Sequence, residues 1–228
     1  MLAVLLPVVS YILVRYYSIR DVQMPHRYFY DSVSVIAKNG KSMEDTAWHH
    51  VRDMEFINQF GKKVSFKDLQ GRIIVLDFFF TRCPTYCPKL AKAMKRLQNS
   101  FTHNDSIVQF ISVTVDPVHD SAVQLRKWAE QYGVNPDNWW LLTGDRDSIY
   151  HFAINEIKAN IADVHVDTAF VHTSDFFLLD KERIIRGWYD GFDSSAQSRL
   201  VRDIPLLMLE KDRKKTFKEF INELFERS

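Results

Sequence analysis

The chain contains two cysteines, Cys83 and Cys87, in the stretch DFFFTRCPTYCPKLAKAMKRL, and a proline follows each of them. Thiols at this spacing can form a disulfide, act as a redox pair or bind a soft metal ion as thiolates. Thiolate ligands favour Cu(I) and Zn(II), but two sulfurs leave the coordination sphere of either ion incomplete. A metal site at this pair would therefore need a third ligand from elsewhere in the chain.

Histidine is the candidate for a third ligand, and the chain has eight. His172 differs from the others because it precedes the apolar run FFLL, where the chain enters a strand expected beside the one that leads to Cys83. A histidine at a strand end more often has a structural role than a ligand role. His165, in the loop DVHVD, is a secondary candidate. Five others are expected at exposed positions: His49, His50, His103, His119 and His151.

Two acidic residues near the cysteines each have two interpretations. Asp77 lies six residues before Cys83 in an otherwise apolar run, where it could assist proton transfer at the thiols or hydrogen-bond to backbone or solvent at the sheet end. Asp116 precedes Pro117 in TVDP, and a strand-ending turn is the more common reason for this dipeptide. A supporting role for Asp116 beside the thiols is the alternative.

The elements around the cysteines alternate between strands and helices. Residues 73–80, IIVLDFFF, are apolar over the length of a strand, which is typical of a strand buried on both faces. From Cys87 the apolar residues recur at helical spacing and predict a helix over 87–101. The order of elements predicts an α/β fold with a central sheet flanked by helices. The other predicted strands are 107–115, 139–144, 170–180 and 183–191, and the other predicted helices are 121–134, 145–158 and 195–211.

This arrangement places Cys83 in the loop before the helix and Cys87 at the start of the helix. Unpaired N–H groups and the helix dipole favour negative charge at a helix N-terminus, and so favour thiolates. A cysteine pair at the first strand-to-helix junction resembles the layout of thioredoxins. Thioredoxins normally have a proline where the neighbouring strand opens, but no proline occurs between Pro136 and Pro205. We expect His172 to occupy that place.

The composition is typical of a folded globular protein, with 228 residues of which 46% are hydrophobic and 26% charged. The 30 basic and 29 acidic residues give a net charge of +1, and no basic patch or stripe suggests a nucleic-acid partner. Two cysteines cannot hold together a domain of this size as a disulfide framework. A chemical role for the pair is therefore favoured.

The N-terminal segment is the compositional outlier. Residues 1–14 carry no charge, and Arg15 and Arg20 follow them. A membrane-spanning helix needs about 20 apolar residues, so this run is marginal in length. No basic leader or small-residue cleavage site precedes the domain, which argues against a cleaved signal peptide. We interpret residues 1–20 as a membrane anchor; the alternative is a buried N-terminal helix.

The rest of the chain divides into three parts. Residues 21–50 are polar and aromatic and are expected to form a tether. Residues 51–211 contain the cysteines and the predicted α/β elements. Residues 212–228 include TFKEFINELFER, whose apolar residues fall on one helical face, and we expect this amphipathic helix to pack on the domain.

Three motifs in this order resemble the Sco/SenC family of membrane-anchored copper-binding proteins: FFFTRCPTYCP, ISVTVDPVHD, and VHTSDFFLLD with GWYDG. The similarity covers roughly residues 55–209. It implies a thioredoxin-like fold and a copper site formed by Cys83, Cys87 and His172. Two departures are Phe79, where many members have a smaller residue, and the lack of an acidic residue directly before His172.

The resemblance implies a copper chaperone that binds a copper ion and assists assembly of the dinuclear copper centre of cytochrome c oxidase. Its partner would be the copper-binding subunit of that oxidase or another copper acceptor. A thiol–disulfide oxidoreductase using Cys83 and Cys87 is the alternative, and a peroxiredoxin-like peroxidase would need one dominant cysteine of low pKa. The anchor and the resemblance together imply the bacterial inner membrane, with the domain on the periplasmic side. The lack of an Arg- and Ser-rich leader argues against an imported mitochondrial precursor.

Overall fold

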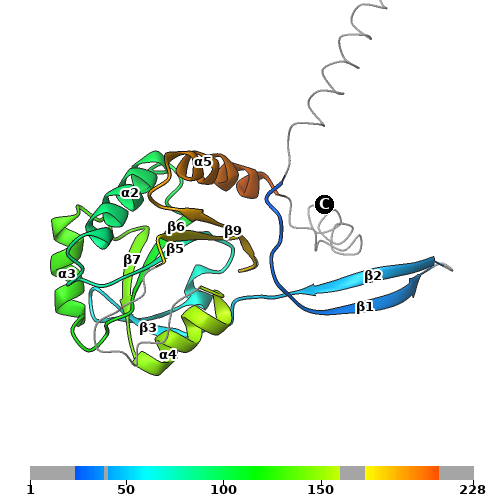
Figure 1. The fold of residues 1–228 in the computed structure, drawn as a ribbon, viewed down its shortest axis with the longest axis horizontal. Coiled ribbons are helices and arrows are strands. Elements are labelled where there is room, and N and C mark those ends of the chain that lie inside the picture. Colours follow the sequence, from blue (N-terminus) through cyan, green and yellow to red (C-terminus); the bar gives the residue numbers. More distant parts are fainter. Residues whose placement is uncertain (1–23, 39–40, 160–172, 211–228) are drawn as a thin grey trace, which may run out of the picture.

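The computed structural model describes residues 24–38, 41–159 and 173–210. Most of these residues surround a seven-stranded sheet of order β4-β3-β7-β6-β5-β8-β9 (Figure 1). Its central strands β5, β6 and β7 are parallel, whereas β8 pairs with β5 in the antiparallel sense. The strands are β3 (Glu55–Asn58), β4 (Lys63–Ser65), β5 (Ile73–Phe79), β6 (Val108–Thr114), β7 (Trp139–Thr143), β8 (Asp175–Leu179) and β9 (Ile185–Asp190).

The core lies on both faces of this sheet. Every residue of β5 is buried, as predicted for its apolar run, and every residue of β6 is buried as well. Successive side chains of a strand point to opposite faces. Phe79 packs against Trp128 of α3 (Ala122–Gln131) with ring centroids 5.6 Å apart, and the Phe78 ring lies 6.5 Å from that of Phe152 in the π-helix η2 (Phe152–Glu156). Helices α3 and η2 therefore cover opposite faces of β5.

The helices agree with the predicted periods, with small shifts at their ends. They are η1 (Phe66–Leu69), α2 (Tyr86–Ser100), α3 (Ala122–Gln131), α4 (Arg146–His151), η2 (Phe152–Glu156) and α5 (Ser194–Leu209). Side chains of Ser121, Asp145 and Asp193 accept hydrogen bonds from backbone N–H groups at the first turns of α3, α4 and α5. In the ranges that the structure describes, no helix is long and apolar enough to cross a membrane. The predicted anchor, residues 1–20, and the predicted tail helix, residues 212–228, lie outside those ranges.

The segment expected to be a tether contains a β-hairpin. Strands β1 (Tyr30–Lys38) and β2 (Lys41–Trp48) pair with each other in the antiparallel sense and extend away from the main sheet (Figure 1). His49, at the base of this hairpin, was expected to be exposed, and that expectation was wrong. Its Nδ1 lies 2.9 Å from the carboxylate of Asp31 and its Nε2 lies 3.2 Å from the carbonyl oxygen of Glu156. The ring is buried because the hairpin joins the domain here.

Candidate metal centre

The two cysteines lie where β5 gives way to α2. Cys83 is in the connecting loop and Cys87 is the second residue of α2, as the sequence predicted. The backbone N–H of Cys87 donates to Sγ of Cys83 at 3.2 Å. The first N–H groups of a helix have no acceptor within the helix itself, and the helix dipole favours negative charge beside them. The loop therefore places the Cys83 sulfur where a thiolate is stabilised.

The two thiols are free and buried, with 4% of Cys83 and 1% of Cys87 exposed, yet their acidities differ. Burial acts to raise the pKa of Cys83, but hydrogen bonds from Cys87 and from the backbone of Thr85 and Tyr86 outweigh it and lower the pKa. Burial raises the pKa of Cys87 far above the ordinary value, and the neighbouring Cys83 and Asp77 raise it further. Cys83 is therefore the thiol that ionises first.

A polar rim surrounds the cysteine loop; it consists of Thr81, Arg82, Thr114, Asp116 and Asp120. Arg82 Nη2 donates to Asp116 Oδ2 at 2.7 Å, and the Thr81 N–H donates to Asp120 Oδ2 at 3.0 Å. The hydroxyls of Thr81 and Thr114 also donate to Asp120. These hydrogen bonds join the loop after β5 to the loop after β6.

Asp116 makes the strand-ending turn that was expected of it, whereas its supporting role beside the thiols stays a prediction. Its carbonyl oxygen accepts the N–H groups of His119 and Asp120 at 3.1 and 2.9 Å, which makes the expected strand-ending turn. Its buried carboxylate holds Arg82, the residue before Cys83, and lies 2.8 Å from Nδ1 of His119. The sequence did not single out Arg82 or Asp120, because their pairing appears only once the two loops meet.

A buried pair of polar side chains, Asp77 and Ser112, forms a floor next to Cys87. Asp77 faces the interior and not solvent, and its Oδ1 has no hydrogen-bond partner among the described residues. Burial raises the pKa of Asp77 to about 7, with a hydrogen bond from Ser112 opposing the shift. Trp139 Nε1 donates to Ser112 Oγ at 3.0 Å, so the Ser112 hydroxyl hydrogen is available to Asp77.

The candidate third ligand, His172, lies outside the described residues, as does His165. Strand β8 begins at Asp175, and its Phe177 pairs with Leu76 of β5. Because the two strands are antiparallel, the start of β8 meets the end of β5 that leads to Cys83. Within the described ranges, no group of three histidine, cysteine or acidic side chains could hold a metal ion. Four histidines expected at the surface are exposed: His50, His103, His119 and His151.

The family model for SCO1/SenC matches residues 42–208, which is more than half of the chain. The chain belongs to the SCO1/SenC family. The SCO1 protein homolog of Bacillus subtilis (strain 168) is 32% identical over 169 residues, which cover 74% of this chain and 88% of that protein. The similarity confirms the family that the three sequence motifs indicated.

Solved Sco structures have the same fold. BsSco, described as a member of the Sco family of cytochrome c oxidase assembly proteins with a disulfide switch, aligns with a TM-score of 0.63 and 32% identity, over 72% of this chain and 96% of that chain. A SCO1/SenC lipoprotein of Bacillus anthracis aligns with a TM-score of 0.64 and 30% identity, over 71% and 95%. Arabidopsis thaliana ScoI, solved with copper bound, aligns with a TM-score of 0.57 and 23% identity, over 68% and 97%. These likenesses confirm the thioredoxin-like α/β architecture.

Two further features are the bulky residue Phe79, which departs from the Sco pattern, and an aromatic cavity at the start of α2. The bulk of Phe79 is accommodated by packing of its ring against that of Trp128, with the centroids 5.6 Å apart. A cavity of about 310 Å³ lies at the first turns of α2, lined by Tyr86, Leu90, Ser174 and Phe192. The exposed rings of Tyr86 and Phe192 have centroids 5.7 Å apart, so the start of α2 presents an aromatic surface of the kind that partner molecules contact.

Proposed function

We propose that this Sco protein is a copper chaperone that carries copper on Cys83, Cys87 and His172 and assists assembly of the dinuclear copper centre of cytochrome c oxidase. The observation that carries the proposal is the pair of free thiols at the start of α2, with Cys83 Sγ accepting the N–H of Cys87. The copper in Arabidopsis thaliana ScoI supports the choice of metal. The oxidase role rests on the description of BsSco as an oxidase assembly protein.

The donor set suits Cu(I), because thiolate and imidazole are the ligands that a soft monovalent ion prefers. Cys83 gives up its proton readily, whereas the pKa of Cys87 is strongly raised by burial. Cu(I) binding must therefore displace the proton of Cys87, and affinity rises with pH. An acceptor with thiolate or imidazole ligands takes the ion by replacing these ligands one at a time.

The test is an anaerobic Cu(I) titration of the reduced full chain in neutral detergent, with a competing chelator. His172→Ala should weaken binding by at least tenfold, which is about 1.4 kcal/mol. His103→Ala, which removes an exposed imidazole from a turn, is the matched control and should bind as the unmodified protein does. Equal affinity in all three proteins would remove His172 from the ligand set.

A thiol–disulfide oxidoreductase is the second candidate, because the two thiols differ so much in acidity. A dithiol with one easily ionised sulfur attacks a disulfide through that sulfur and resolves it with the other. This function predicts that Cys83→Ser abolishes reduction of an oxidised copper-site peptide, whereas His172→Ala leaves the rate unchanged. A rate that is unchanged in Cys83→Ser would contradict thiol exchange through this sulfur.

We also propose that residues 1–20 anchor the protein in the bacterial inner membrane with the domain in the periplasm. The support is the uncharged run of residues 1–14 followed by Arg15 and Arg20. Protease added to spheroplasts should digest the domain while leaving a cytoplasmic control protein intact. Digestion only after the spheroplasts are lysed would contradict this orientation.

A further inference from the structure

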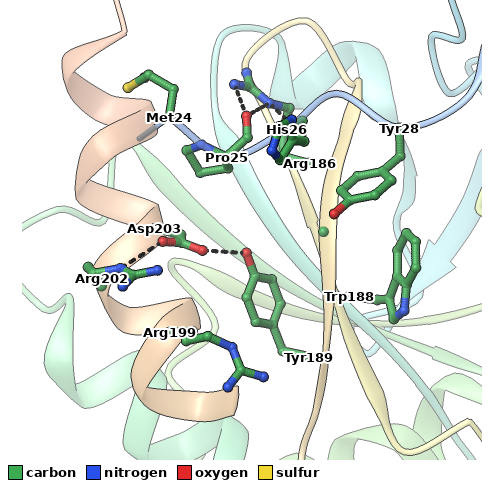
Figure 2. Close-up of a pocket in the computed structure, with 11 residues that line it drawn as sticks. Met24, Pro25, His26, Tyr28, Arg186, Trp188, Tyr189, Arg199, Arg202 and Asp203 are labelled. Atoms are coloured by element: carbon green, nitrogen blue, oxygen red, sulfur yellow. Dashed lines mark hydrogen bonds and ion pairs between the residues drawn. The ribbon is translucent and has the colours of Figure 1, made fainter. Parts of the chain in front are cut away.

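A second cavity lies at the β9 edge of the sheet, separate from the cysteine loop. It has a volume of about 350 Å³ and is enclosed by β9, α5 and the segment that leads into β1 (Figure 2). Two arginines of α5, Arg199 and Arg202, line it, with Tyr189 and Asp203 between β9 and the helix. None of these residues takes part in the rim or the floor of the candidate metal centre.

The two arginines present unused donors to this cavity. They are three residues apart on α5, so their side chains lie on the same side of the helix. Arg199 Nη1 donates to the hydroxyl of Ser195 at 3.1 Å, and among the described residues no carboxylate forms an ion pair with Arg199. Arg202 donates through Nε to Asp203 Oδ1 at 3.1 Å. Each guanidinium has five N–H donors, so most of the donors on both groups remain available to a ligand.

The acidic residue in the cavity orients an arginine and does not fill the site. Asp203 is buried; its Oδ2 accepts the hydroxyl of Tyr189 at 2.8 Å and its Oδ1 accepts Arg202 Nε. Burial raises the pKa of Tyr189, and the hydrogen bond to Asp203 raises it further, so this hydroxyl stays protonated and donates. With both oxygens of Asp203 engaged, the charge of Arg199 is left without a partner in the cavity.

The opposite wall is held in place by a buried arginine. Arg186 Nη2 donates to the carbonyl oxygen of Pro25 at 2.6 Å and its Nε to that of His26 at 3.2 Å, while Asp180 pairs with its Nη1 at 2.9 Å. These bonds fix the segment from Met24 to His26 against the domain (Figure 2). Because its backbone is pinned, the cavity is preformed and a ligand need not order this wall.

We propose that this cavity binds a phosphate group between Arg199 and Arg202. Like charges three residues apart on a helix repel each other, and an anion placed between them removes that cost. Guanidinium groups bind phosphate and carboxylate through paired N–H donors. The tetrahedral oxygens of a phosphate reach donors that do not share a plane, whereas a planar carboxylate is filled by a single guanidinium. Phosphate is therefore the better match to two arginines.

The phosphate could belong to a free phosphate ester or to the headgroup of an anionic phospholipid. The chain enters the domain at Met24, which lines the cavity, and only 10 positions separate it from Val14 at the end of the uncharged run. An extended segment of that length spans at most about 35 Å. A bilayer holding residues 1–14 would therefore keep headgroups within reach of α5. The headgroup source rests on the proposed anchor, whereas the free-phosphate source does not.

The first arm of the test measures phosphate binding by the full chain in neutral detergent. Trp188 lines the cavity and is 47% exposed, so its fluorescence can report on inorganic phosphate or glycerol phosphate added at constant ionic strength. We expect a saturable change whose half-saturation concentration rises at least tenfold in Arg199→Gln/Arg202→Gln. The control Lys62→Gln/Lys63→Gln removes two exposed charges at the β4 end, the other edge of the sheet, and should bind normally. Equal responses in both double variants would overturn the proposal.

The second arm identifies the source of the phosphate. The full chain is reconstituted in phosphatidylcholine vesicles with or without phosphatidylglycerol, and hydrogen exchange of α5 and β9 is compared. Protection of α5 only with phosphatidylglycerol, lost in Arg199→Gln/Arg202→Gln, would assign the site to a headgroup. Binding of soluble phosphate without protection on vesicles would assign it to a free ester, and a response in neither arm would overturn the proposal.

Cu(I) titration of the same variants separates this result from the copper proposal, since their copper affinity should be unchanged. If the double variant does not fold, Arg199→Gln alone, which breaks no ion pair, replaces it.

Discussion

The buried carboxylates of the rim and of the floor differ in how many hydrogen bonds they accept. In the rim, Asp120 accepts three hydrogen bonds from Thr81 and Thr114, and Asp116 pairs with Arg82. In the floor, Asp77 has one oxygen without any partner among the described residues. The rim carboxylates have hydrogen-bond donors on their oxygens, whereas burial destabilises the charge of Asp77 and raises its pKa to about 7.

The rim therefore keeps the two loops in position, whereas the floor makes the site sensitive to pH. A carboxylate that already accepts several hydrogen bonds holds the two loops together, and its energy changes little when a neighbouring group gains or loses a proton. An under-satisfied carboxylate beside Cys87 changes the acidity of that thiol whenever its own proton is lost. The rim should therefore dominate the stability of the loops, and the floor should dominate their dependence on pH.

The largest expected effect concerns Asp77→Asn in the floor. The unfolded carboxyl loses its proton near its ordinary pKa of 3.8, but the folded one keeps it up to about 7, so the folded protein binds the extra proton between these values. The free energy of unfolding should fall as pH rises through this window, by up to about 4 kcal/mol, and stay level above it. Asp77→Asn should remove the fall. Urea unfolding of the reduced apoprotein at pH 4, 6 and 8 measures it.

The control for this prediction is Asp137→Asn, which removes an exposed carboxylate and should leave the pH dependence as it is in the unmodified protein. If the curves of Asp77→Asn and Asp137→Asn run parallel across the three pH values, the floor does not carry a destabilised carboxyl. The contrast with the rim would then be lost.

The next effect in size concerns Asp120→Ala in the rim. The change leaves the Thr81 N–H and the hydroxyls of Thr81 and Thr114 without their acceptor. Each buried donor left without its acceptor costs roughly 1–3 kcal/mol, and these costs are not additive for neighbouring groups. We therefore expect the free energy of unfolding to fall by about 3 kcal/mol. Urea unfolding at pH 7 measures it. A loss below about 1 kcal/mol would mean that the rim is not held by these hydrogen bonds.

The parts of the site that could be predicted from sequence are those encoded by local pattern. The apolar run before Cys83 and the helical period after Cys87 were sufficient to place the cysteines at the start of α2. Strands β3 and β4 were missed because each is only four or three residues long and is partly exposed. A strand of three or four residues is too short for an alternation of apolar and polar residues to be recognised.

The rest of the site depends on contacts between distant parts of the chain. His49 is buried by a contact with Glu156, 107 positions away, and Thr81 meets Asp120 across 39 positions. Neither pair is visible in a local window, since the sequence around each residue resembles an exposed turn. The low solvation of Asp77 likewise comes from helices packed over β5, so sequence could name the residue but could not decide its environment.

The third prediction compares the thiols themselves. Cys87→Ser leaves Cys83 with the backbone N–H of residue 87 still donating to it, and Cys83→Ser leaves Cys87 alone next to the floor. Because the thiolate is the reactive form, Cys83 should be alkylated by iodoacetamide at pH 7.5 at least tenfold faster than Cys87. Both thiols are buried, so access favours neither strongly, and the same reaction in urea should show equal rates. Equal rates in the folded proteins would contradict the assigned difference in acidity.

The smallest expected effect comes from His119, an exposed partner of the rim residue Asp116. His119 lies 2.8 Å from Asp116, but about half of its side chain is exposed, so solvent screens the pair. His119→Gln should change the free energy of unfolding by less than about 0.5 kcal/mol, because Arg82 still holds the other oxygen of Asp116. Urea unfolding alongside Asp120→Ala measures the difference. A His119→Gln loss as large as that of Asp120→Ala would mean that proximity to the loop, and not burial of a satisfied carboxylate, stabilises the rim. Since His119 and Asp120 are adjacent in one turn, this pair of variants tests burial with the backbone setting held nearly constant.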